Sequence, residues 1–137
     1  MNGRRDTVGA KVCRGIRGAT TATNQREAIL SATRELLQQI VEANDVRPAD
    51  VASIFFTMTP DLDAEYPALA ARQMGWTQVP LLCAQEIARP DGLPQAIRVL
   101  IHWNTTLSQA EIHHIYMNGA EVLRPDFAST VIQEDQA

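Results

Sequence analysis

The stretch AIRVLIHWN, from Ala96 to Asn104, has the clearest structural pattern in this sequence. Its large apolar side chains occupy every second position, at Ile97, Val99, Ile101 and Trp103. Neighbouring side chains of an extended chain point to opposite faces of a sheet, so this alternation predicts a β-strand with one buried face. Arg98 and His102 stand between the apolar positions. We therefore expect both of them on the other face of the sheet, outside the core.

Four more strands are predicted around this one. Their segments are short, mostly apolar and bounded by turn residues, and they run from Val12 to Ala19, Val51 to Thr59, Val79 to Ala84 and Ile112 to Met117.

Two helices are predicted between these strands. Apolar residues recur at three- and four-residue steps after Asn24 and predict a long helix. Asn24 and Glu27 have the spacing of a capping box at its start, and we expect the helix to end at Asn44. A shorter helix is expected from about Pro67 to Met74, because proline is tolerated in the first turn of a helix and Gly75 stops it.

The order of these elements predicts an α+β fold, with one mixed β-sheet and the helices on one face. We expect residues 12–127 to form the domain, residues 1–11 a disordered extension and residues 128–137 a mobile tail. The second face of the sheet then has no helix to cover it. Either it is polar and solvated, or a symmetric oligomer covers it.

Composition limits the classes of function. A chain of 137 residues with 45% hydrophobic residues fits a single globular domain, and its net charge of -4 argues against nucleic acid as a partner. No apolar run follows Arg4 and Arg5, so we expect neither a signal peptide nor contact with a membrane. Cys13 and Cys83 have no metal-like spacing and are interpreted as reduced thiols of a cytoplasmic protein.

Arginine dominates the residues that could carry chemistry, since eleven of the twelve basic residues are arginine. The three histidines have no recognisable zinc spacing, and no glycine-rich phosphate loop follows the first strand, so neither a metal nor a cofactor is predicted. What remains is a set of hydrogen-bond donors suited to a carboxylate. Its members are Arg17, Arg72, Arg98 and Arg124, with Cys83, Glu86 and Tyr116.

Cys83 and Glu86 are three residues apart, which places them on opposite faces of a regular strand. They can share one site only if the strand ends or bulges between them.

The sequence resembles the AroH class of monofunctional chorismate mutases. The resemblance is carried by Arg14-Gly15-Ile16-Arg17-Gly18-Ala19-Thr20-Thr21, Thr59-Pro60-Asp61-Leu62, Tyr66-Pro67-Ala68 to Arg72, Gly75-Trp76, Val79-Pro80 to Cys83, Glu86, Ile97-Arg98-Val99, His114-Ile115-Tyr116 and Leu123-Arg124-Pro125-Asp126. It implies a homotrimer in which three sheets form a pseudo-α/β-barrel, with active sites at the subunit interfaces. It also implies the Claisen rearrangement of chorismate to prephenate, a step towards phenylalanine and tyrosine.

The resemblance also implies a role for each matching residue. Arg98 would face the ether oxygen of chorismate, while Cys83 and Glu86 would contact the ring hydroxyl. The residues implied in substrate binding are Arg17 and Tyr116 at the enolpyruvyl carboxylate, Arg72 and Arg124 near the ring carboxylate, and Tyr66 and Ala68 lining the pocket. Leu69 stands where a relative has a charged residue at the rim of the pocket.

Two other classes of protein are compatible with an arginine-rich site. A non-catalytic trimeric binding module for a small carboxylate needs arginines, but it has no use for a cation facing an ether oxygen. An imine or enamine deaminase on a similar trimeric fold binds a single carboxylate through one arginine. The several arginines here argue against the deaminase.

Overall fold

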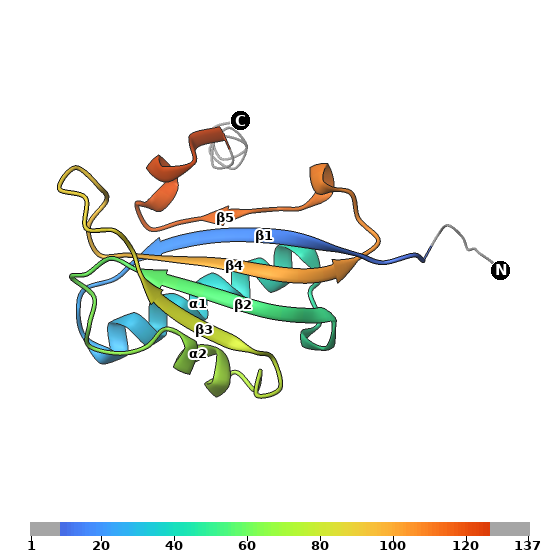
Figure 1. Ribbon diagram of the computed structural model, residues 1–137, viewed down its shortest axis with the longest axis horizontal. Helices are drawn as coiled ribbons and strands as arrows, with labels where there is room; N and C mark the ends of the chain where they lie inside the picture. Colours follow the sequence, from blue (N-terminus) through green and yellow to red (C-terminus); the bar gives the residue numbers. More distant parts are fainter. Residues whose placement is uncertain (1–8, 127–137) are drawn as a thin grey trace.

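A five-stranded sheet in the order β3-β2-β4-β1-β5 forms the centre of the computed structural model, which describes residues 9–126 (Figure 1). The strands are β1 Val12–Thr21, β2 Val51–Met58, β3 Leu81–Gln85, β4 Ala96–Thr105 and β5 Ile115–Tyr116. The central strand β4 is antiparallel to β1 and β2, whereas the edge strands β5 and β3 run parallel to β1 and β2. The predicted mixed sheet is thus confirmed. The C-terminal tail and most of the N-terminal extension lie outside the described residues.

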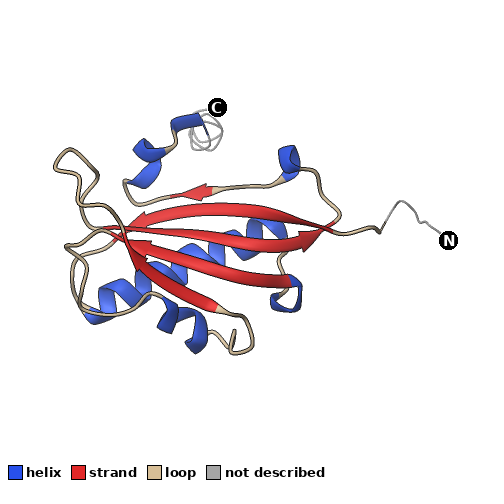
Figure 2. Cartoon of the chain, in the orientation of Figure 1, coloured by secondary structure: helices blue, strands red, loops and turns tan. Residues whose placement is uncertain are grey.

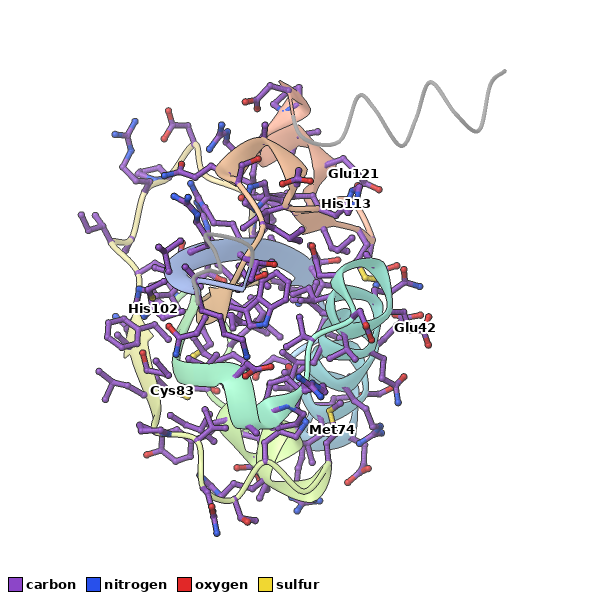
Figure 3. All side chains as sticks on the ribbon, turned by 90° about the vertical axis from the view of Figure 1, so that its right-hand side faces the viewer. Glu42, Met74, Cys83, His102, His113 and Glu121 are labelled. Atoms are coloured by element: carbon purple, nitrogen blue, oxygen red, sulfur yellow. The ribbon has the colours of Figure 1, made fainter. Side chains whose placement is uncertain are left out.

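The two α-helices, α1 Arg26–Asn44 and α2 Ala68–Gln73, lie on the same face of the sheet (Figure 2). The described residues also form three short 3-10 helices: η1 Pro48–Asp50, η2 Gln109–Glu111 and η3 Ala120–Leu123. Viewed from the end, His102 lies on the opposite side of the sheet from Glu42 and Met74 (Figure 3). Within residues 9–126, no helix is both long and apolar enough to cross a membrane.

The apolar face of β4 packs under α1 as the alternation predicts. Ile101 is fully buried in the main core cluster, together with Ile16 of β1 and Phe56 of β2. Leu36, Leu37 and Ile40 contribute the buried face of α1 to the same cluster.

The face without helices, called the open face below, is partly apolar. Phe55 and Leu82 are 45% and 57% exposed on it. The Phe55 ring stands edge-on to the His102 ring, with ring centroids 5.7 Å apart, and Nδ1 of His102 lies 2.9 Å from the Ser53 hydroxyl. Exposed aromatic and leucine side chains on a sheet face are typical of a surface that another molecule covers.

The start of α1 differs from the prediction. Gln25 is the N-cap residue and makes no side-chain capping bond, so the capping box at Asn24 and Glu27 is wrong. The side-chain oxygen Oδ1 of Asn24 accepts hydrogen bonds from the backbone N–H groups of Asp63 and Ala64, at 3.0 and 2.9 Å. A contact with a distant loop has replaced the local cap.

The end of α1 and the start of β5 are linked. Asn44 is the last helical residue and Asp45, in the left-handed conformation, caps the helix. The Asn44 amide accepts from the backbone N–H of His113 and donates to its carbonyl, both at 2.9 Å. These bonds occupy the backbone groups of His113 that a longer β5 would use in the ladder. The predicted last strand, Ile112 to Met117, is therefore shortened to Ile115–Tyr116.

Gly18 permits α1 to lie close to β1. A Cβ atom there would lie 2.9 Å from Cδ1 of Ile40 and 3.0 Å from the backbone oxygen of Ile115. We expect Gly18→Ala to lower the free energy of unfolding by about 1–3 kcal/mol, because these neighbours are buried or part of the backbone. Urea unfolding measures this loss. Gly15→Ala is the control, since its Cβ would meet only Cδ1 of Leu100, at 3.3 Å, and an equal loss in both variants would contradict the packing argument.

Candidate active site

Arg98 lies at the centre of a polar group on the open face. It is on β4, paired with Thr57 of β2, and its side chain is 36% exposed. Its Nε lies 3.0 Å from Oε2 of Glu86, and the same carboxylate oxygen accepts a 2.5 Å hydrogen bond from the Thr57 hydroxyl. The Glu86 side chain is only 16% exposed. The carboxylate therefore forms an ion pair with the guanidinium at the edge of solvent, although the Arg98 Nε–H makes no hydrogen bond within the described residues.

Three further predicted residues, Tyr116, Arg17 and Arg124, lie in the same region as Arg98. Ala19 of β1 pairs with Arg98 on one side and with Tyr116 of β5 on the other, so the three residues form one row across the sheet. Arg17 is two residues before Ala19 and, by alternation, faces the same way. Arg124 follows η3 and binds Asp126 with two bonds, Nε to Oδ1 at 3.0 Å and Nη2 to Oδ2 at 2.6 Å.

Burial, rather than the charges of this group, favours the neutral form of the tyrosine. Burial raises the pKa of the Tyr116 phenol, while the nearby Arg17, Arg124 and Arg98 guanidiniums act in the opposite direction. A neutral phenol can donate a hydrogen bond to an anion. The group thus combines three guanidiniums and one phenol on a single surface.

A cavity of about 420 Å³ opens beside Glu86 and Arg98. The turn 59–61 and the loop 87–94 supply the rest of its lining. Asp61 holds the base of that loop, since its carboxylate accepts the backbone N–H of Gln95 at 3.0 Å. Neither Asp61 nor Thr57 is among the residues predicted from the sequence. Asp61 belongs to the Thr59-Pro60-Asp61-Leu62 motif, whereas only the pairing of Thr57 with Arg98 across two strands identifies Thr57.

The other four predicted residues, Cys83, Arg72, Ala68 and Tyr66, lie away from the open-face residues. Cys83 of β3 pairs with the buried Phe56 and packs against the main core on the helix side. Burial raises the pKa of the Cys83 thiol, while the Ala68 backbone and the Arg72 guanidinium lower it. The thiol is therefore protonated at neutral pH and is a poor nucleophile. Arg72 is exposed on α2, Ala68 is buried, and Tyr66, just before the helix, is 65% exposed.

Cys83 and Glu86 do not share a site within one chain. β3 ends at Gln85, but the backbone N–H of Glu86 still donates to the Met58 carbonyl at 2.8 Å, so the alternation of faces extends from Cys83 to Glu86. The predicted residues thus form two groups. The open-face group is Arg17, Glu86, Arg98, Tyr116 and Arg124, and the helix-side group is Tyr66, Ala68, Arg72 and Cys83.

The available donors suit an anion with more than one acid group. In the described part of the chain, no set of three or more His, Cys, Asp or Glu side chains is arranged to hold a metal ion. A guanidinium binds a carboxylate through two parallel bonds, and several guanidiniums in one region favour a polyanion. Glu86 would repel a carboxylate, but it can accept a hydrogen bond from a hydroxyl.

Comparison with known proteins identifies relatives of this chain. The sequence profile of the family described as "Chorismate mutase type I" matches residues 13–127. Chorismate mutase AroH of Thermus thermophilus is 48% identical over 118 residues, covering 85% of this chain and 97% of the relative. Chorismate mutase AroH of Bacillus subtilis (strain 168) is 44% identical over 119 residues, covering 85% and 94%. The solved structure of a Clostridium thermocellum chorismate mutase, Cth-682, has a TM-score of 0.78 at 46% identity and covers 80% of this chain and 98% of that one.

Proposed function

This chain belongs to the chorismate mutase type I family and is a chorismate mutase, and on that premise we propose how its residues act on chorismate. The reaction is an isomerisation in which the ether C–O bond of chorismate breaks as a C–C bond forms, giving prephenate. The carboxylate-binding module and the deaminase considered above are not favoured by these relatives. The rearrangement needs no nucleophile or proton transfer. It needs a substrate held in a folded conformation and a cation where negative charge develops.

Arg98 supplies that cation in our proposal. Its Nε lies against the Glu86 carboxylate in an ion pair, so we assign its two terminal nitrogens to the ether oxygen, which gains negative charge in the transition state. The Glu86 oxygen that faces away from Thr57 accepts the hydrogen bond of the ring hydroxyl. This arrangement needs no reorganisation as the charge develops, which is the condition under which electrostatic stabilisation is largest.

The remaining residues bind and orient the two carboxylates. Arg17 and Tyr116 contact the enolpyruvyl carboxylate, and Arg72 and Arg124 lie near the ring carboxylate. Arg124 must share its guanidinium between Asp126 and the substrate, because both Nε and Nη2 bind Asp126 in this structure. Cys83 contacts the ring hydroxyl, and Tyr66 and Ala68 line the pocket. Holding both ends of a flexible substrate contributes to the rate acceleration, because it orients the two reacting ends.

These roles require two subunits, which supports our proposal of a homotrimer. Cys83 and Glu86 both contact the ring hydroxyl, yet they lie on opposite sides of the sheet in one chain. A neighbouring subunit that presents its helix-side group to the open-face group would complete the site. It would also cover the exposed Phe55 and Leu82 side chains.

We expect sedimentation equilibrium to give about three times the 15.1 kDa mass of the chain. The measurement is made at micromolar concentration. A monomer under these conditions would contradict the trimer and the shared site together. We further propose a cytoplasmic location, which the free thiols of Cys13 and Cys83 support.

The observation that carries the proposed mechanism is the Arg98–Glu86 ion pair beside the 420 Å³ cavity. The direct test is to mix the purified protein with chorismate and follow both the loss of its ultraviolet absorbance and the formation of prephenate. Chorismate rearranges slowly without enzyme, so a protein-free sample is the control. A rate no faster than that control would contradict the proposal.

A further inference from the structure

The backbone of Arg17 is held by a side chain from the far end of the chain. Its N–H donates a 2.9 Å hydrogen bond to Nδ1 of His114, 97 residues away in sequence. The parallel pairing of β1 with β5 begins only at Gly18 and Ile115. The N–H of Arg17 therefore lies before the start of β5, where the strand offers no backbone carbonyl to accept its hydrogen bond. The imidazole ring takes the place of that carbonyl.

We propose that His114 is a positioning residue that sets the place of Arg17 through this hydrogen bond. The inference rests on the carboxylate-binding role proposed for Arg17. The ring acts only while Nδ1 carries no proton, because a protonated Nδ1 would present one donor to another. The neutral tautomer with its proton on Nε2 is therefore the active form.

The position of His114 is itself well defined. The preceding residue, His113, is held at both its backbone N–H and its carbonyl by the buried Asn44 amide. A continuous set of contacts thus runs from the end of α1 through residues 113 and 114 to the backbone of Arg17. Because the backbone before it is anchored in this way, the His114 side chain can fix the backbone of Arg17 to within the few tenths of an ångström that a carboxylate site requires.

Burial and the neighbouring guanidiniums favour the neutral form of the His114 ring. His114 is half-buried, and burial is the largest cause that lowers its pKa, followed by the Arg17 and Arg124 guanidiniums. His113 acts in the same direction more weakly, and the Asp126 carboxylate opposes them. The neutral form is thus favoured on folding. The stability that it contributes is present above the ordinary pKa of histidine and is lost as the pH falls through the lowered pKa.

Protonation of His114 should therefore weaken substrate binding without slowing the chemical step. We expect kcat to stay level while KM rises as the pH falls through the lowered pKa of His114, which lies below the ordinary value of about 6.5, and this gives kcat/KM an acid limb. His114→Asn is the decisive variant, because the Asn carbonyl oxygen can stand near the position of Nδ1 and does not titrate. It should keep the KM of the unaltered protein at neutral pH and lose the part of the acid limb that His114 causes.

His114→Ala removes the acceptor and should raise KM about tenfold at neutral pH with little change in kcat. Arg17→Ala separates the inference from the function on which it rests. If Arg17→Ala leaves KM unchanged, the proposed role of Arg17 is wrong and the inference about His114 fails with it. If Arg17→Ala raises KM, then adding His114→Ala to it should raise KM little further, since the two changes remove the same interaction.

His113→Asn is the matched control, because His113 is exposed and only its backbone takes part in the contacts. It should leave KM at neutral pH unchanged and move the acid limb only slightly, because His113 lowers the pKa of His114 only weakly. Nitrogen NMR of the His114 ring provides a second readout at neutral pH, where an unprotonated Nδ1 is expected. The inference is overturned if the ring carries its proton on Nδ1, if His114→Asn retains the full acid limb, or if the effects of Arg17→Ala and His114→Ala on KM simply add.

Discussion

Arg98→Ala should lower kcat by about a hundredfold or more, which corresponds to a loss of at least about 3 kcal/mol of transition-state stabilisation. The guanidinium in our proposal meets charge that exists only as the ether bond breaks. Interactions of that kind lower kcat when removed, whereas interactions made equally with the bound substrate raise KM. Steady-state kinetics with chorismate separates the two. A near-normal kcat with a raised KM would make Arg98 a carboxylate ligand and leave the ether oxygen without its cation.

Two further variants sharpen this test. Arg98→Lys keeps the positive charge but loses the planar fork that meets both Glu86 and the substrate, so it should recover only part of the rate. Arg89→Ala is the matched control, because Arg89 lines the same cavity and its guanidinium binds Asp91 at 3.1 Å. We give Arg89 no role in the reaction, and its variant should keep kcat close to that of the unaltered protein.

Mixed oligomers of two impaired variants should regain activity that neither variant has alone. Arg98→Ala removes a member of the open-face group. Arg72→Ala removes a member of the helix-side group and should raise KM about tenfold or more, through lost charge-assisted hydrogen bonds worth about 1.5–3 kcal/mol. If each site joins the two groups across an interface, refolding the variants together in equal amounts should give about one unimpaired site in four. Assays at low chorismate concentration would detect these sites against a weak background.

The control for this experiment is a mixture of the same two preparations, each refolded alone. It should show only the average of the two impaired activities. If the joint refolding yields no more than this average, while sedimentation shows that mixed oligomers have formed, then both groups act within one subunit. That result would contradict the shared site even if the protein is a trimer.

Local sequence patterns correctly predicted the strands and helices that pack one face against a single core along their whole length. The alternation in β4 placed Ile97 and Ile101 in the core and Arg98 outside it, and the structure agrees. The apolar steps of α1 likewise predicted its buried face. Periodicity of this kind depends only on the geometry of the element itself and on one adjoining core.

Local patterns failed where a distant contact competed with a local one. Asn24 and Glu27 have the spacing of a capping box, but the Asn24 amide binds the loop at Asp63 and Ala64 instead. Ile112 to Met117 has the composition of a strand, but Asn44 binds the backbone of His113 and shortens it. In both cases, a single side-chain amide satisfies backbone groups that the local structure would otherwise have used.

The sequence by itself determined the candidates for the site: several arginines, one of them on the polar face of a predicted strand, and a glutamate near a strand end. Spacing also separated Cys83 from Glu86, because an odd step along a strand places side chains on opposite faces. Only the tertiary structure decided that the ladder hydrogen bonds extend from β3 to Glu86, that the Glu86 carboxylate contacts both Thr57 and Arg98, and that His114 holds the backbone of Arg17. The Thr57–Glu86 and Arg17–His114 hydrogen bonds join residues that are 29 and 97 positions apart in sequence. Strand register and chain crossings bring such residues together, and neither is encoded in the periodicity of any one segment.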